Sequence, residues 1–245
     1  MIAMDTLKEL LGELRPGRVL DIATGSGAFA RRLAESVASY GELVAVDSAR
    51  RAVDAAAKNL AELRNARAEL GDASALPYPD GSFDLVGIAN SLHHFAAPGR
   101  AIAEAGRVLA PGGVLAVLEM HRDAETEAER THALLHRWWA EIDRAGGAYH
   151  DEPFPRARFR ELLGGEGFAE VRWGEERDLE SDPKDPELMD QLAGTFAAYR
   201  AKIATLAEDD RRRLLAEGEE LEARAKETGF RSAPSIVFAA RKATR

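Results

Sequence analysis

The sequence contains no cysteine in its 245 residues. This absence excludes disulfide bonds, iron–sulfur clusters, thiolate zinc sites and cysteine nucleophiles. The chain also lacks an apolar run of the roughly 18 residues that a membrane-spanning helix requires. Its start, MIAMDTLKELLGELRPG, has neither the basic flank nor the apolar centre of a signal peptide. We therefore expect a cytoplasmic protein without a membrane span.

Basic residues are in deficit as well. Lys and Arg number 33 against 42 Asp and Glu, which gives a net charge of −9. Affinity for a nucleic-acid backbone comes mainly from many Lys and Arg contacts, so nucleic acid is not expected as the main partner. Apolar residues make up 45% of the chain, enough for a full core. The length allows one large domain, or one domain with a substantial insertion.

The first half of the chain alternates short apolar runs with amphipathic stretches. Such alternation is typical of βαβ units with a parallel sheet. Strands are predicted at Arg18–Ala23, Leu43–Val46, Ala66–Leu70, Phe83–Ala89 and Val114–Leu118, and helices at Ala28–Ser39, Ala49–Leu63 and Pro98–Leu109. Each run is too short for a helix and is bounded by turn-forming residues, which favours buried strands.

The pattern changes after Met120. Within 123–145, one amphipathic helix is predicted from a stripe of apolar residues: Leu134, Leu135, Trp138, Trp139 and Ile142. Further helices are expected at Pro155–Leu163 and within Pro186–Thr228, and strands at Phe168–Arg172 and Ser235–Arg241. We therefore divide the chain into a sheet half, 1–120, and a second part, 121–245, that contributes a helical lid and the last two strands of the same sheet. The insertion between these two strands covers about 183–229.

The strongest local motif is VLDIATGSGAFA, residues 19–30. Gly25 and Gly27 let backbone pass close to a ligand, and the helix that follows offers unpaired N–H groups. Asp47 ends the next strand, where a carboxylate can accept both hydroxyls of a ribose. The spacing also fits a dinucleotide site, since Asp47 lies 20 residues after Gly27. Asp21 argues against that alternative, because a carboxylate there would face pyrophosphate but would suit the ammonium of an amino-acid tail.

Three later segments bear on the choice: Gly71-Asp72-Ala73, PYPDGSFDLVGIANSLHHF (77–95) and RVLAPGGVLAVLEM (107–120). With the glycine motif before them, they resemble the class I S-adenosylmethionine-dependent methyltransferases. The resemblance covers about residues 15–120 and is greatest to the branch containing the ubiquinone/menaquinone C-methyltransferases. One departure is Ala23, where many members carry a glycine. We expect this alanine to narrow the turn without abolishing binding.

The resemblance implies an α/β fold: a Rossmann-like, seven-stranded, doubly wound sheet, mostly parallel with an antiparallel last strand, plus helical lid insertions. It implies S-adenosylmethionine as cofactor and S-adenosylhomocysteine as product. The implied cofactor residues are Asp21 near the ammonium, Ala23, Gly25 and Gly27 along the methionine and ribose, Asp47 at the ribose hydroxyls, Ser48 beside the adenine, Asp72 and Ala73 at its polar edge, Asn90 at the methionine portion, and His94 near the transferred methyl. His94 is also the candidate catalytic residue.

The acceptor cannot be identified from these motifs. Its candidate contacts are His136, Trp139, Tyr149 and His150, and a small molecule is the favoured acceptor. A protein or RNA methyltransferase, a non-catalytic cofactor-binding protein and a nicotinamide oxidoreductase stay open, as does a homodimer formed through 186–228. His132 and His136 have metal-ligand spacing, but Ala133 breaks the H-E-x-x-H pattern and no third ligand is evident. We expect no metal.

Overall fold

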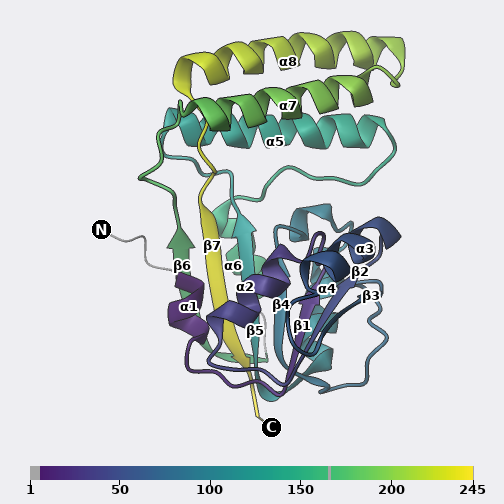
Figure 1. Ribbon diagram of the computed structural model, residues 1–245, viewed down its shortest axis with the longest axis vertical. Coiled ribbons are helices and arrows are strands. Elements are labelled where there is room, and N and C mark those ends of the chain that lie inside the picture. Colours follow the sequence, from purple (N-terminus) through teal and green to yellow (C-terminus); the bar gives the residue numbers. More distant parts are fainter. Residues whose placement is uncertain (1–5, 165–166, 245) are drawn as a thin grey trace.

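The computed structural model describes residues 6–164 and 167–244. Its centre is a seven-stranded sheet in the order β3-β2-β1-β4-β5-β7-β6 (Figure 1). The strands are β1 (Arg18–Ile22), β2 (Glu42–Asp47), β3 (Ala66–Leu70), β4 (Phe83–Ala89), β5 (Leu109–Met120), β6 (Phe168–Glu176) and β7 (Ser235–Lys242). Only β7 runs antiparallel to its neighbours, β5 and β6. The predicted fold class is confirmed. The first five residues, within the segment where we expect no signal peptide, lie outside the described residues.

Helices cover both faces of the sheet, each over a separate apolar core. One face carries α1 (Thr6–Leu11), α2 (Ala28–Ser36) and α3 (Arg50–Asn59), and the other carries α4 (Pro98–Val108) and α6 (Arg156–Leu163). Of these five helices, all except α1 were predicted from the sequence, although α3 ends earlier than predicted. β5 and β6 are longer than predicted, because Leu109 pairs with Phe83 of β4 and the last residues of both strands, Glu119–Met120 and Trp173–Glu176, pair with β7.

A third layer consists of α5 (Glu127–Ala145), α7 (Pro186–Ile203) and α8 (Glu208–Thr228). Figure 1 shows these three helices stacked beyond one end of the sheet. They enclose a core of their own, formed by Leu135, Trp138, Ile142, Leu192, Phe196, Ile203, Leu214, Leu221 and Ala225. The Trp138 indole N–H also donates to the Leu214 carbonyl at 2.9 Å. We call α5, α7 and α8 the lid layer.

The lid layer corrects one expectation. A lid that closes over the sheet edge, as predicted for 121–245, would turn the apolar stripe of α5 toward the crevice there, but the stripe packs on α7 and α8 instead. The reason is that these helices supply apolar partners, whereas the sheet edge is lined by strand-end polar groups. His136, on another side of α5, therefore lies at the sheet edge, with its ring centroid 4.9 Å from that of His93. The helices of the described residues include none long and apolar enough to cross a membrane.

Polar contacts fasten α5 to the rest of the molecule. Thr126 and Glu129 form a capping box at its start, and Glu129 is fully buried. Arg177, just past β6, donates to both Glu129 oxygens at 2.8 and 2.9 Å and also pairs with Glu125. Hydrogen bonds to a charged group are typically worth about 1.5–3 kcal/mol. The position of α5 at the end of the sheet is therefore well anchored.

Candidate functional site

The glycine motif forms a turn between β1 and α2. Ala23, Gly25 and Gly27 all have positive φ, at 55°, 55° and 84°. A Cβ on Gly27 would lie 3.2 Å from the Ala56 Cα, so the close approach of α3 also requires this glycine. A Cβ on Gly25 would meet nothing within 4 Å, because the residue borders an open cleft. Ala23 holds a conformation that an L side chain adopts only with strain.

Asp47 connects two loops at the end of β2. Its Oδ2 accepts from the Gly25 N–H and its Oδ1 from the Ala49 N–H, both at 2.9 Å. Each carboxylate oxygen has a further lone pair, so Asp47 can still accept hydroxyl protons from a ribose. Its two backbone bonds fix the direction of the carboxylate before any ligand binds.

Asp21 lies beneath the turn rather than in the cleft. Its side chain is 1% exposed, and its Oδ2 accepts from the Thr24 hydroxyl at 2.5 Å. Its Oδ1 has no hydrogen-bond partner among the described residues. Burial raises the pKa of Asp21 to about 7. A buried carboxylate with one unpaired oxygen would accept a nearby cationic group, because that group would favour the charged form.

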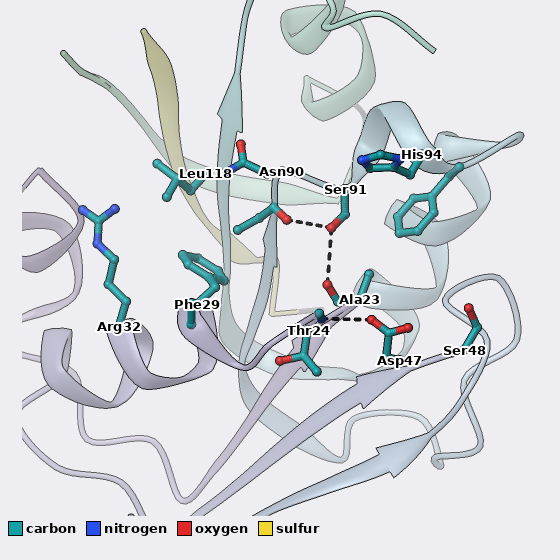
Figure 2. A pocket seen from close by; sticks show the side chains of 14 residues that line it. Ala23, Thr24, Phe29, Arg32, Asp47, Ser48, Asn90, Ser91, His94 and Leu118 are labelled. Carbon is teal, nitrogen blue, oxygen red and sulfur yellow. Dashed lines mark hydrogen bonds between the residues drawn. The ribbon is translucent and has the colours of Figure 1, made fainter. Parts of the chain in front are cut away.

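Two adjoining clefts open at the carboxyl ends of β1, β2 and β4, with volumes of about 570 and 400 Å³. Both are lined by Ala23, Asp47, Ser48, His94 and Phe95. Figure 2 shows Asp47 and Ser48 on one side of the larger cleft and Phe29 and Arg32 on the other. Asp72 and Ala73 line the smaller cleft. Of the predicted cofactor positions, all except Asp21 and Gly27 line at least one cleft.

The end of β4 is positioned by β5. Asn90 has a φ of 44°, and its Oδ1 accepts from the Met120 N–H at 3.0 Å. Glu119 of β5 is fully buried, and its Oε1 accepts from the N–H groups of Ser91 and Leu92 at 2.6 and 2.8 Å. Glu119 therefore holds the start of the short helix η1 (Leu92–His94). Glu119 was not predicted as a functional residue. Its position near the end of the apolar run VLAVLEM is the signal in the sequence that could have identified it.

Histidines gather behind the clefts. His93, His94, His136 and His150 lie together, with the His94 ring centroid 4.3 Å from that of His93 and 4.1 Å from that of His150. Only His94 lines the two clefts; His136 and His150, predicted as acceptor contacts, lie behind it. The pKa of His94 is lowered by partial burial of its ring and by His93 and His150 beside it. Burial also lowers the pKa of His136 to about 2.

The remaining predicted acceptor contacts are separated. Tyr149 is 50% exposed and lines the smaller cleft. Trp139 lines neither cleft and stacks on Tyr199 in the lid layer, with ring centroids 5.4 Å apart. His132 also lines neither cleft, and its Nδ1 accepts at 2.8 Å from the N–H of Ala233, in the connection between α8 and β7. Spacing on a helix therefore did not show which α5 side chains approach the site.

Comparison with known proteins agrees with this geometry. Residues 19–113 match the family model described as a methyltransferase domain. A malonyl-[acyl-carrier protein] O-methyltransferase of Geobacter sulfurreducens is 30% identical over 192 residues, 78% of this chain and 70% of that protein. A demethylmenaquinone methyltransferase of Thermus thermophilus is 45% identical over 113 residues, 45% of this chain and 50% of the relative. The chain thus spans about half the length of several curated relatives.

A solved structure supports the fold. A protein of Bacillus halodurans, described as a methyltransferase, superposes with a TM-score of 0.62 over 97% of each chain at 21% identity. The relatives show that the chain belongs to the class I S-adenosylmethionine-dependent methyltransferases. The residues fit the family's cofactor, S-adenosylmethionine. Asp47 can accept hydrogen bonds from ribose hydroxyls, and Gly25 has no Cβ to block the cleft. Asp21 adds a buried carboxylate oxygen without a partner among the described residues.

Proposed function

We propose that this protein transfers a methyl group from S-adenosylmethionine to a small-molecule acceptor by in-line displacement. The observation that carries the proposal is the pair of clefts at the carboxyl ends of β1, β2 and β4, which share Asp47 and His94. Clefts of a few hundred Å³ at this edge of an open α/β sheet are where small ligands bind. Their combined shape suits an elongated ligand with Asp47 at its middle.

The two clefts suggest a division of the cofactor. In the smaller, Asp72 and Ala73 would contact the adenine, with Ser48 beside it. In the larger, Gly25 and Asn90 would lie along the ribose and methionine portion. Asp21 would neutralise the ammonium group from beneath the turn. Asp72 would accept a hydrogen bond from the adenine amino group as a charged carboxylate. Hydrogen bonds from the Ser74 backbone N–H and hydroxyl favour this form, because they hold the pKa of Asp72 below its usual range.

The bound cofactor supplies an electrophilic methyl group on a sulfonium. The protein's task is then chiefly alignment, which can contribute about 7–11 kcal/mol to lowering a barrier. His94, at the junction of the clefts, is the candidate catalytic residue because its imidazole can hydrogen-bond an acceptor beside the methyl group. Phe29, Phe95 and Leu118 would exclude water around it. A separate strong base is needed only for an acceptor that enters protonated.

We infer that residues 1–120 hold the cofactor, while residues 121–245 select the acceptor. The Thermus relative matches only over 113 residues, so its quinone acceptor, taken from that protein's name, is one candidate for this chain. A small acceptor is favoured over RNA by the net charge of −9 and by the lid layer beyond the clefts. An acyl acceptor, taken from the name of the Geobacter relative, is a second candidate, because that alignment extends past the sheet half.

The first test measures cofactor affinity by titration calorimetry with S-adenosylmethionine, S-adenosylhomocysteine and NAD⁺. We expect the first two to bind and NAD⁺ not to bind. Asp47→Ala should weaken S-adenosylmethionine at least tenfold, about the loss of one charged hydrogen bond. Asp54→Ala, an exposed acid on α3, is the matched control and should leave affinity unchanged. Preferential NAD⁺ binding, or an unchanged affinity in Asp47→Ala, would contradict the assignment.

The second test concerns turnover. The protein is incubated with S-adenosylmethionine and a panel of quinols, phenols, carboxylic acids and amines, and S-adenosylhomocysteine is quantified. Formation of S-adenosylhomocysteine that depends on one small acceptor would support the proposal. If the cofactor binds but only a protein or RNA substrate is methylated, the macromolecular alternative is correct. If nothing in either class turns over, the protein is a binding protein rather than an enzyme.

A further inference from the structure

The histidine cluster contains imidazoles from three separate segments of the chain. His93 lies in η1 at the sheet edge, His136 in α5, and His150 in the connection between α5 and α6. Ring centroids are 4.9 Å apart for His93 and His136, and 5.0 Å apart for His136 and His150. The Asp151 N–H donates to the His93 carbonyl at 2.8 Å, which holds the connection against η1. The backbone itself therefore brings these three side chains together.

The nitrogens of these histidines fall into two groups. Facing outward from the cluster, the Nδ1 of His93 lies 3.3 Å from Glu119 Oε2, and the Nδ1 of His150 lies 2.8 Å from Asp143 Oδ2. By contrast, His93 Nε2, His150 Nε2 and His136 Nδ1 are buried without a hydrogen-bond partner among the described residues. One nitrogen from each of the three histidines lies within 4.8 Å of the other two.

We propose that His93, His136 and His150 bind one divalent transition-metal ion of the zinc type, with Glu119 and Asp143 orienting two of the three imidazoles. Histidine ligands almost always donate their second ring N–H to a carboxylate, carbonyl or water, which is the arrangement seen for His93 and His150. Imidazole ligands suit Zn²⁺, Co²⁺, Ni²⁺ or Cu²⁺, whereas Mg²⁺ and Ca²⁺ prefer oxygen. The inference concerns metal binding and does not depend on methyl transfer.

The geometry is close to what such an ion requires. With Zn–N bonds of about 2.0–2.1 Å, ligand nitrogens around a tetrahedral ion are about 3.3 Å apart. Small rotations of the rings would close the cluster from 4.8 Å to that spacing. Three protein ligands leave a fourth position for water or another small ligand. This proposal revises the expectation of no metal: His136 is joined not by His132 but by His93 and His150, which come from other segments.

The competing explanation is that these are neutral histidines packed in a core. His132 is an example of such a neutral, packed histidine, because its Nδ1 accepts a hydrogen bond from the Ala233 N–H at 2.8 Å. The three cluster nitrogens have no such partner. Buried polar atoms in proteins are nearly always paired, so three unpaired nitrogens within one histidine cluster call for a ligand. A metal ion satisfies all three at once.

The site has a structural consequence for the lid. Its ligands join the sheet edge, α5 and the chain after α5, so a bound ion would fasten the lid layer over the histidine side of the clefts. His94 lies between His150 and the clefts, with its ring 4.1 Å from that of His150. The ion would thus lie behind His94, away from the cofactor. We therefore expect metal removal to loosen the lid while leaving the cofactor site formed.

The test uses the full chain without a histidine tag, stripped with a chelator and dialysed. Co²⁺ is added, and the visible absorption of a four-coordinate cobalt site is followed until saturation. We expect one equivalent to saturate it, Zn²⁺ to displace the cobalt, and Zn²⁺ to raise the melting temperature. His136→Ala and His150→Ala should weaken Zn²⁺ at least 100-fold. His132→Gln, on the same helix but able to keep its bond to Ala233, should stay within threefold of the parent.

Folding of each variant is checked by circular dichroism, and S-adenosylmethionine affinity by calorimetry. That affinity should stay within about fivefold in the stripped protein and in the folded variants. If the parent chain shows no stoichiometric cobalt spectrum and no Zn²⁺-dependent rise in melting temperature, the metal site does not exist. The proposal is equally wrong if His132→Gln loses metal as strongly as His136→Ala. Neither outcome would affect the methyl-transfer proposal, which rests on cofactor binding and turnover.

Discussion

The sheet half and the lid layer reach their candidate functions in different ways. In the sheet half, the candidate ligand contacts come from short segments in which a strand end, a turn and a helix start follow one another in sequence, as with Asp21, Gly25 and Asp47. Where the lid layer meets the sheet, by contrast, His93 of η1, His136 of α5 and His150 after α5 are brought together from three distant segments. Recognition of the cofactor is thus encoded locally, whereas the histidine cluster depends on the tertiary fold.

The largest effect we predict tests whether the buried Asp21 carboxylate of the sheet half lowers the stability of the ligand-free protein while it favours cofactor binding. The pKa of Asp21 is raised to about 7 in the folded protein, against 3.8 as its ordinary value. The protonated Asp21 carboxyl contributes its full stabilisation of the folded protein below about pH 4. This contribution is lost as the pH rises from about 4 to 7, because Asp21 ionises at a lower pH in the unfolded chain than in the folded one. Three pKa units correspond to at most about 4 kcal/mol. Asp21→Asn should therefore raise the free energy of unfolding at pH 8 by about 2–4 kcal/mol.

Urea titration of the ligand-free protein measures this change, and the gain should shrink by more than half at pH 5. Cofactor binding should change in the opposite direction. Affinity of the parent for S-adenosylmethionine should improve about fivefold between pH 6 and 7.5 as Asp21 ionises, and Asp21→Asn should bind weakly with a flat profile. A destabilised Asp21→Asn variant at pH 8 would show that the carboxylate is already charged and well compensated.

The next prediction tests whether the lid layer folds around its own core. A Cβ at Gly218 of α8 would lie 2.5 Å from Cζ2 of Trp138, so Gly218→Ala should push α8 away from α5. We expect a loss of about 1–3 kcal/mol in the free energy of unfolding. S-adenosylmethionine affinity should stay within threefold. A loss of cofactor binding of similar size would mean that the two regions are not separable.

Gly194 of α7 provides the matched control. A Cβ there would meet nothing within 4 Å. Gly194→Ala should raise the free energy of unfolding by about 0.5–1 kcal/mol, since alanine is the better helix former. Thermal unfolding of both variants, followed by circular dichroism, gives the comparison. If both substitutions change stability in the same direction, packing on Trp138 is not what limits position 218.

A smaller effect is expected where the two regions meet. Tyr149 lines the smaller cleft, whereas Trp139 is turned into the lid layer against Tyr199. With the acceptor found by the panel above, Tyr149→Ala should lower kcat/KM about tenfold while cofactor affinity stays within threefold. Trp139→Ala should act mainly on stability. Equal kinetic losses in both variants would show that the acceptor extends into the lid.

The smallest effect concerns Ala23. Its φ of 55° is strained for alanine, and glycine would remove that strain at the cost of a more flexible unfolded chain. Ala23→Gly should raise the free energy of unfolding by about 0.5 kcal/mol, the difference of these two effects, and leave cofactor affinity unchanged. Ala57→Gly, in an exposed interior position of α3, should instead lose about 1 kcal/mol. Denaturant midpoints measured in parallel resolve differences of this size.

The sequence was sufficient to predict most of the sheet and most of the residues that line the two clefts. Buried parallel strands are short apolar runs, and Gly25 and Asp47 mark their ends by residue type alone. The sequence was insufficient to predict the packing of the amphipathic helix α5, which had two surfaces on which its apolar stripe could pack. The stripe containing Trp138 could have faced the sheet or the lid, and periodicity cannot distinguish them. Glu119 was missed for a different reason, since its buried role becomes visible only when Ser91 and Leu92 are placed beside it.

The order of the strands also bears on how the chain is made. β7 follows β6 in sequence but lies between β5 and β6, with α7 and α8 in the connection. A nascent chain emerging from the ribosome can therefore complete β1 to β5, while β6 has no neighbour to pair with until Lys242 has been synthesised. N-terminal parts generally fold first during synthesis. The cofactor clefts should thus form on the ribosome before the lid, and an unpaired β6 is the stage most exposed to aggregation.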